Sequence, residues 1–116
     1  MATIAMALPI LSGKSDGFRK FMSEVAGPKL AEFEASEARM GIVREGWFLQ
    51  PTPMGDLAVV HAEADNPMAS LGAFIASDHP FDVWFKQQIL ELTGVDLAQP
   101  GPPIETLLDW NAPARV

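Results

Sequence analysis

The sequence contains no cysteine and only two histidines among its 116 residues. Without cysteine the chain has no disulfide framework, no thiolate metal ligand and no thiol nucleophile, which fits a reducing, cytoplasmic setting. No apolar run is long enough to span a bilayer. Because no basic residues precede the apolar residues 4–11, we interpret them as a first strand and not as a signal peptide.

Basic residues are also few, with eight Lys and Arg against fifteen Asp and Glu and a net charge of −7. Such a chain repels nucleic acid phosphates and anionic lipid, so we expect no nucleic-acid partner and no membrane partner. The length suits a single domain over residues 1–116. No phosphate-binding loop and no organic cofactor motif is visible, so no cofactor is predicted.

Hydrophobic periodicity divides the chain into strands and helices. Gly27 and Pro28 interrupt the first helical stretch, which predicts a kink or two abutting helices. Asn66 and Pro67 cap and start the next helix, and Gly41 and Gly94 end helices. The predicted strands are residues 3–11, 42–50, 57–64 and 104–110, the main helical stretches are 17–40 and 81–93, and a proline-rich connector covers 98–103.

The predicted order is β-α-β-β-α-α-β. Split βαβ halves of this kind form an α+β, ferredoxin-like sandwich, in which a four-stranded antiparallel sheet carries its helices on one face. The other face has no cover within the chain. Because an uncovered apolar sheet face usually marks an interface, we expect a homodimer.

Three segments, ALPILSGK, LQPTPMGDLAVV and SDHPFDVWF, resemble those of a small bacterial family within the dimeric α+β barrel superfamily. That superfamily includes antibiotic-biosynthesis monooxygenases. The resemblance implies a dimer whose two sheets close into a barrel. It also implies a small-molecule enzyme or binder that holds an apolar or aromatic ligand there, with oxygen chemistry that is cofactor-free or uses haem or a metal.

Pairing Gln50 with Leu57 across the turn sets the register of the central hairpin. Three further cross-strand pairs then share one face: Phe48 with Val59, Gly46 with His61, and Arg44 with Glu63. The opposite, helix-facing side carries Val43, Trp47 and Leu49 beside Ala58, Val60, Ala62 and Ala64. Glu45 also falls on that side, which is awkward for a carboxylate unless the strand end frays.

His61 beside Glu63 is the candidate catalytic pair, with His61 as the acid/base and Glu63 orienting it. Arg44 or Gln50 would bind an oxyanion or carbonyl, and Gly46 opposite His61 would leave open volume above the imidazole. The remaining predicted substrate-binding residues are Phe48 and Val59. Two alternatives stay open: an ordinary Arg44–Glu63 ion pair beside a hydrogen-bonded His61, and a non-catalytic ligand-binding or structural dimer.

A metal site would need His79 as a third ligand beside His61 and Glu63, and His79 is better explained as part of a helix cap, so no metal is predicted. Trp110, at the end of the last predicted strand, would anchor an interface. A set of aromatic residues either lines a ligand pocket or packs in the core, and its helical spacing favours the core. The set is Phe74, Phe81, Trp84 and Phe85.

Overall fold

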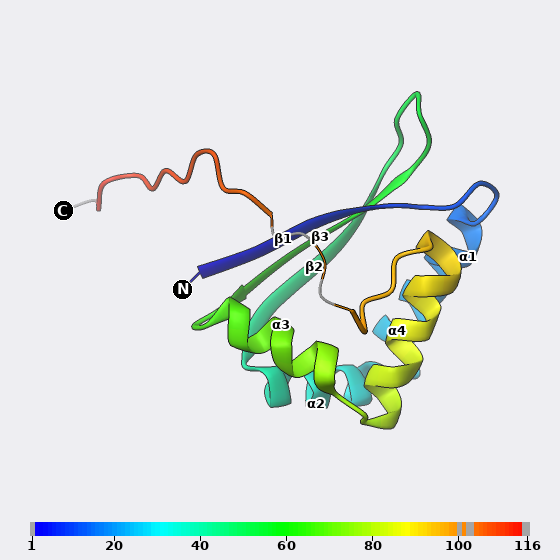
Figure 1. Cartoon of the computed structure of the whole chain (residues 1–116), viewed down its shortest axis with the longest axis horizontal. Coiled ribbons are helices and arrows are strands. Elements are labelled where there is room, and N and C mark those ends of the chain that lie inside the picture. The colour runs from blue at the N-terminus through cyan, green and yellow to red at the C-terminus, as the bar shows by residue number, and fades with distance from the viewer. Residues whose placement is uncertain (1, 100, 102–103, 115–116) are drawn as a thin grey trace.

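The computed structural model describes residues 2–99, 101 and 104–114. These residues form an α+β domain of three strands and four helices (Figure 1). The elements, in chain order, are β1 (Ala2–Pro9), α1 (Ser15–Ala26), α2 (Leu30–Met40), β2 (Ile42–Gln50), β3 (Leu57–Ala64), α3 (Pro67–Ala76) and α4 (Pro80–Thr93).

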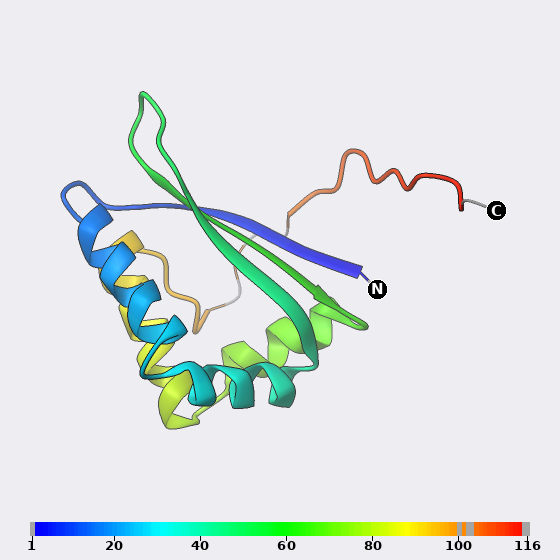
Figure 2. The ribbon, with the colours of Figure 1, turned by 180° about the vertical axis from the view of Figure 1, so that it is seen from behind.

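The three strands form one antiparallel sheet in the order β1-β3-β2. All four helices lie on one side of this sheet, α1 beside α4 and α2 beside α3 (Figures 1 and 2). We call the uncovered side the open face. Its residues on β3 are Leu57, Val59, His61 and Glu63, which alternate with the fully buried, helix-facing alanines of the same strand.

The hairpin register is as predicted. Gln50 lies opposite Leu57, and the three further pairs, up to Arg44 with Glu63, also form. The prediction is wrong only at Val43, which is 59% exposed. A bulge between Ile42 and Arg44 shifts the register by one residue, so Ile42 and not Val43 lies on the helix side at the start of β2.

The helix boundaries follow from local chemistry. The Gly27-Pro28 interruption separates α1 from α2, so the alternative of two helices is confirmed. The Asn66 side chain accepts a hydrogen bond from the Ala69 amide and caps α3. Gly41 and Gly94 end α2 and α4 with positive φ angles of 72° and 75°, a conformation that glycine adopts without a Cβ penalty.

The predicted fourth strand does not form in the described chain. Residues 104–110 contain no strand, and every side chain among them is exposed. The four-stranded ferredoxin-like sheet is therefore not confirmed. A strand needs a neighbouring edge to pair with, and this segment runs out past the start of β1 instead (Figures 1 and 2). The predicted connector 98–103 includes Pro100, Pro102 and Pro103, which lie outside the described residues.

The core lies between the sheet and the helices. Phe21, Phe85 and Ile89 are almost fully buried there, and the Phe21 and Phe85 rings pack edge to face with centroids 5.0 Å apart. Phe74 and Phe81 pack against Phe85 in the same cluster, so the aromatic set packs in the core as predicted, and three of its members, Phe74, Phe81 and Phe85, also line a cavity. Among the described residues, no helix has the length and apolar character that crossing a bilayer requires.

Candidate functional site

The open face brings together the site residues expected from the sequence. Arg44 is exposed beside the half-buried Glu63, and His61 follows along β3. Among the described residues, however, no ion pair joins Arg44 to Glu63. The side-chain amide of Gln50 donates to the carbonyl of its neighbour Pro51 at 3.0 Å. This hydrogen bond does not connect Gln50 to the other candidate site residues.

The open volume predicted above the His61 imidazole is not found. The ring of Phe48 leans over Gly46, so that a Cβ at residue 46 would lie 3.1 Å from two ring carbons. Phe48 is 61% exposed and Val59 lies opposite it. The Phe48 ring therefore takes up the space over Gly46 on the open face, and His61 lines neither of the two cavities described below.

His79 is not placed to be a third metal ligand beside His61 and Glu63. It occupies the N-cap position of α4, on the helix side of the sheet, whereas His61 lies on the open face. Its side chain makes no cap hydrogen bond. Within the described residues, no group of three or more His, Cys, Asp or Glu side chains is arranged to hold a metal ion.

A cavity of about 80 Å³ lies on the other side of the sheet, between the three strands and the helices. Its wall is overwhelmingly apolar and includes the rings of Phe33, Trp47 and Phe74. The polar side chains in the wall are Ser36, Ser70, Glu37 and Glu45. Both serine hydroxyls already donate, Ser36 to Asp82 and Ser70 to the Met40 carbonyl, so the two carboxyl groups are the ionisable groups in the wall.

The two carboxyl groups come from different elements. Glu45 lies on β2 opposite Ala62, on the helix side as predicted, and its strand is not frayed there. The indole Nε1 of Trp47, two residues on, donates to Glu45 Oε2 at 2.8 Å. Glu37 lies on the last turns of α2 and is within hydrogen-bonding reach of Glu45. We call Glu37 and Glu45 the carboxyl pair.

Burial controls the protonation of the carboxyl pair. It raises the pKa of Glu37 from 4.5 to about 8, helped by the negative charge of Glu45, by the hydrogen bond between them and by the charge of Asp82. Burial also raises the pKa of Glu45, against hydrogen bonds from Trp47 and Glu37 that lower it. At neutral pH, Glu37 is therefore protonated, and the hydrogen bonds that Glu45 receives from Trp47 and Glu37 favour the ionised form of Glu45.

The negative charge of the pair has no cationic partner among the described residues. Both ion pairs found there involve other carboxylates: Arg19 with Asp16, and Arg39 with Asp82 at 3.2 Å. The buried Lys86 ammonium donates its hydrogen bonds to three carbonyl oxygens at the α3–α4 junction. Because a charge in an apolar surrounding without a counter-charge is costly, ionisation of the pair without a bound cation lowers the stability of the fold.

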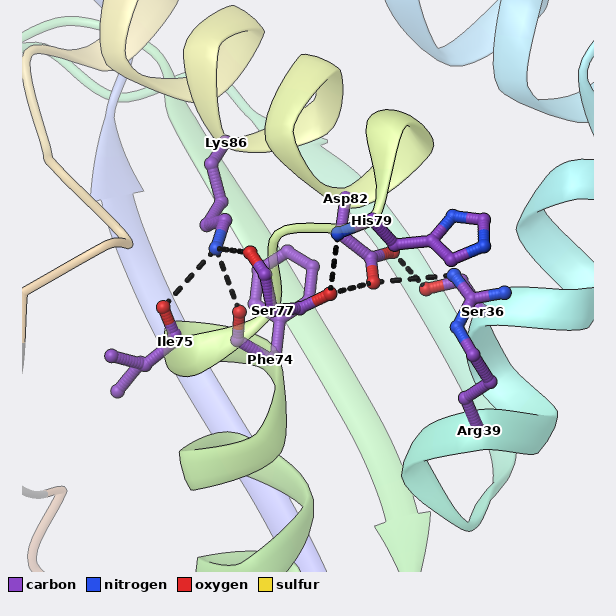
Figure 3. A network of polar contacts seen from close by, with 8 residues as sticks. All are labelled: Ser36, Arg39, Phe74, Ile75, Ser77, His79, Asp82 and Lys86. Carbon is purple, nitrogen blue, oxygen red and sulfur yellow. Dashed lines mark hydrogen bonds and ion pairs between the residues drawn. The ribbon is translucent and has the colours of Figure 1, made fainter.

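A second polar network joins α2, the helix that carries Glu37, to α4 (Figure 3). Buried Asp82 accepts from the hydroxyls of Ser36 and Ser77 and from Arg39. Burial alone would raise the pKa of Asp82, but these hydrogen bonds outweigh it and the pKa is lowered. Lys86 holds the end of α3 nearby, through the carbonyls of Phe74, Ile75 and Ser77 (Figure 3). Since Ser36 precedes Glu37, this network helps to fix the position of Glu37.

Sequence analysis did not include Glu37 among the candidate site residues, although Glu37 lines the cavity. The signal was present in the spacing: Phe33, Glu37 and Met40, at positions i, i+4 and i+7 of α2, all line the cavity. The helix-facing position of Glu45 was recognised but explained by fraying. The pattern that identifies the site is one carboxyl group on each of two apolar surfaces that face each other.

Comparison of the chain with protein-family models, with curated proteins and with solved structures finds no match. The resemblance to the dimeric α+β barrel superfamily therefore stays a prediction from the sequence. The features that point to a function are the cavity and the carboxyl pair within it.

Proposed function

We propose that the protein binds a small apolar amine, as its ammonium ion, in the cavity beside Glu37 and Glu45. The observation that carries this proposal is a half-buried carboxyl pair, in the wall of an apolar cavity, that has no cation among the described residues. An ammonium group supplies the missing charge and donates hydrogen bonds to both carboxyl groups. A neutral ligand leaves the charge uncompensated.

The wall of the cavity supports the same ligand class. The rings of Phe33, Trp47 and Phe74 offer apolar contact to the body of the ligand and aromatic faces to its cationic end. By volume, the cavity has room for roughly five to eight water molecules. That space suits an amine with a short chain or a single small ring.

Protonation of Glu37 couples ligand binding to pH. An ammonium ion beside the pair favours the ionised form of both carboxyl groups, so it lowers the raised pKa of Glu37. Binding near neutral pH therefore releases a proton, and the release disappears above the free-state pKa of about 8. The same pair, holding one proton and one charge, is a suitable donor and acceptor for proton transfer on the bound molecule.

The test compares two probes of nearly equal shape, cyclopentylamine and cyclopentanol. The Trp47 indole N–H, which donates to Glu45, is the reporter in ¹H–¹⁵N NMR titrations. We expect the amine to bind with a dissociation constant near the millimolar range and at least about tenfold more tightly than the alcohol. Equal binding of the two probes, or no shift of the Trp47 indole, would refute the proposal.

Two variants define the role of the pair in that experiment. Glu45→Gln removes the charge at nearly constant shape, and it should abolish the preference for the amine. Glu34→Gln makes the same change on an exposed position of α2, and it should leave the preference intact. If both variants behave alike, the effect is one of net charge and not of the site.

A second candidate function concerns the open face. The exposed ring of Phe48, beside Val59 and Leu57, favours a homodimer that covers this face. Such a dimer would enclose Arg44, Glu63 and His61, and it would restore the environment in which His61 was predicted to act as an acid/base on an apolar or aromatic ligand. The non-catalytic version of the same dimer uses the face only as an interface.

Sedimentation velocity on the Phe48→Glu variant tests this second candidate. A dimer through the open face should dissociate in that variant, and a protein that is monomeric before the change contradicts the interface. Within a dimer, His61→Ala separates the two versions. Loss of ligand binding or turnover supports the catalytic version, whereas unchanged behaviour leaves His61 a structural residue.

A further inference from the structure

The outer edge of β1 is open. β1 pairs with β3 alone within the part of the chain that the structure describes, so its other edge presents unpaired backbone N–H and C=O groups. A groove of about 620 Å³ touches all six consecutive residues 3–8 of this strand. Because neighbouring side chains of a strand point to opposite faces, a groove that touches all six runs along the edge. We call it the edge groove.

The far wall of the edge groove is apolar. It is formed largely by α3, through Met68, Leu71 and Ile75, with Val95 and Leu97 from the segment after α4. Met68 is 72% exposed, which is unusual for a large apolar side chain next to a free strand edge. An extended segment laid in this groove would pair with β1 and cover α3.

The C-terminal segment, residues 104–110, has the pattern of such a strand. Ile104, Thr106, Leu108 and Trp110 alternate with Glu105, Leu107 and Asp109, so one face is largely apolar and the other largely acidic. Yet Leu108 is 85% exposed and Trp110 is 72% exposed. The fold thus contains an unpaired edge and an unpaired strand-like segment of matching length.

The segment is not placed to fill its own groove. Ile104 and Thr106 touch the edge groove, and the chain then continues outward past the start of β1 (Figures 1 and 2). A second copy presents the same groove, and exchange between two copies is reciprocal, as twofold symmetry requires. We propose that two copies exchange their C-terminal segments, each adding residues 104–110 as a strand to the β1 edge of the other.

Sedimentation velocity across about 1–100 μM of the full chain tests the exchange. Leu108→Glu places a charge on the face that enters the groove and should raise the dimer dissociation constant at least about tenfold. Leu107→Glu is the matched control, since Leu107 is 86% exposed but lies on the opposite face of the strand. A wild type that is monomeric throughout, or equal effects of both variants, would overturn the exchange.

The absence of cysteine allows a second test of which copy fills the groove. Gly72 lines the groove and has no atom within 4 Å of an added Cβ, so Gly72→Cys fits there. Mixed with Leu108→Cys protein and oxidised, it should give disulfide-linked dimers of one chain of each kind. Double variants that instead cross-link within single chains would show that the segment fills its own groove, which contradicts the exchange.

One variant distinguishes the exchanged dimer from a dimer that forms through the open face. Phe48 lies on β2, at the far edge of the sheet from β1, so Phe48→Glu should leave the exchanged dimer intact. If Phe48→Glu dissociates the dimer and Leu108→Glu does not, the dimer uses the open face and the exchange is refuted.

Discussion

Replacing Glu37 by Gln should change how the stability of this protein depends on pH. The folded state holds a proton on Glu37 up to about pH 8, whereas the unfolded chain releases it near 4.5. Between these values the folded state binds more protons than the unfolded state, so stability falls as pH rises. Glu37→Gln keeps the hydrogen-bond donor toward Glu45 and removes the titration, so its stability should fall much less.

The magnitude follows from the two pKa values. At 1.36 kcal/mol per pKa unit, the difference between 4.5 and about 8 corresponds to at most about 5 kcal/mol. The Glu37 side chain is half-buried and keeps some contact with water. We therefore expect roughly half of that value, ~2–3 kcal/mol, between about pH 5 and about pH 9.

Urea unfolding followed by circular dichroism at several pH values is the assay. The free energy of unfolding of the wild type should fall by ~2–3 kcal/mol more than that of Glu37→Gln, which is about 2 M in the urea midpoint. Glu34→Gln, at an exposed position of the same helix, should retain the wild-type slope. Parallel pH profiles for the wild type and Glu37→Gln would refute the shared proton.

Three further changes test the polar groups around the cavity. Asp82→Asn should lower the free energy of unfolding by about 1.5–3 kcal/mol at neutral pH. Because the pKa of Asp82 is lowered in the folded state, this contribution is present above its ordinary 3.8 and is lost as pH falls below it, which urea unfolding at acid pH measures. Lys86→Met leaves three carbonyls without their donor and should cost about 2 kcal/mol, read from the thermal midpoint. Glu45→Leu should raise the free energy of unfolding by about 1–2 kcal/mol near pH 8 and should abolish amine binding. A lower free energy of unfolding in this variant would show that Glu45 stabilises the fold.

The sequence predicted the sheet well because its signals there are local. Gly55 and the prolines beside it define a tight turn, and a turn of known length fixes every pair along the hairpin. Asn66 and Gly94 act as caps through their own backbone and side-chain chemistry. The bulge at Val43 escaped prediction because it depends on how the strand leaves α2.

The carboxyl pair could not be predicted from the sequence, for a different reason. The raised pKa of Glu37 arises from burial against a distant strand, and only the packing of α2 on β2 creates that burial. The prediction of a fourth strand failed likewise, since residues 104–110 have a strand pattern but the chain runs outward past the start of β1 and does not pair with its edge. Periodicity indicates which residues suit a strand, and it does not identify the partner.

The central claim is that Glu37 and Glu45 share one proton in an apolar cavity, and ¹³C NMR of the glutamate side-chain carboxyl carbons measures it directly. In a titration from about pH 3 to about pH 10, one glutamate should titrate near pH 8, and that transition should vanish in Glu37→Gln. Addition of cyclopentylamine should move the same transition to lower pH. If every glutamate titrates between about pH 4 and pH 5, the carboxyl pair holds no shared proton and the cavity is not the site described.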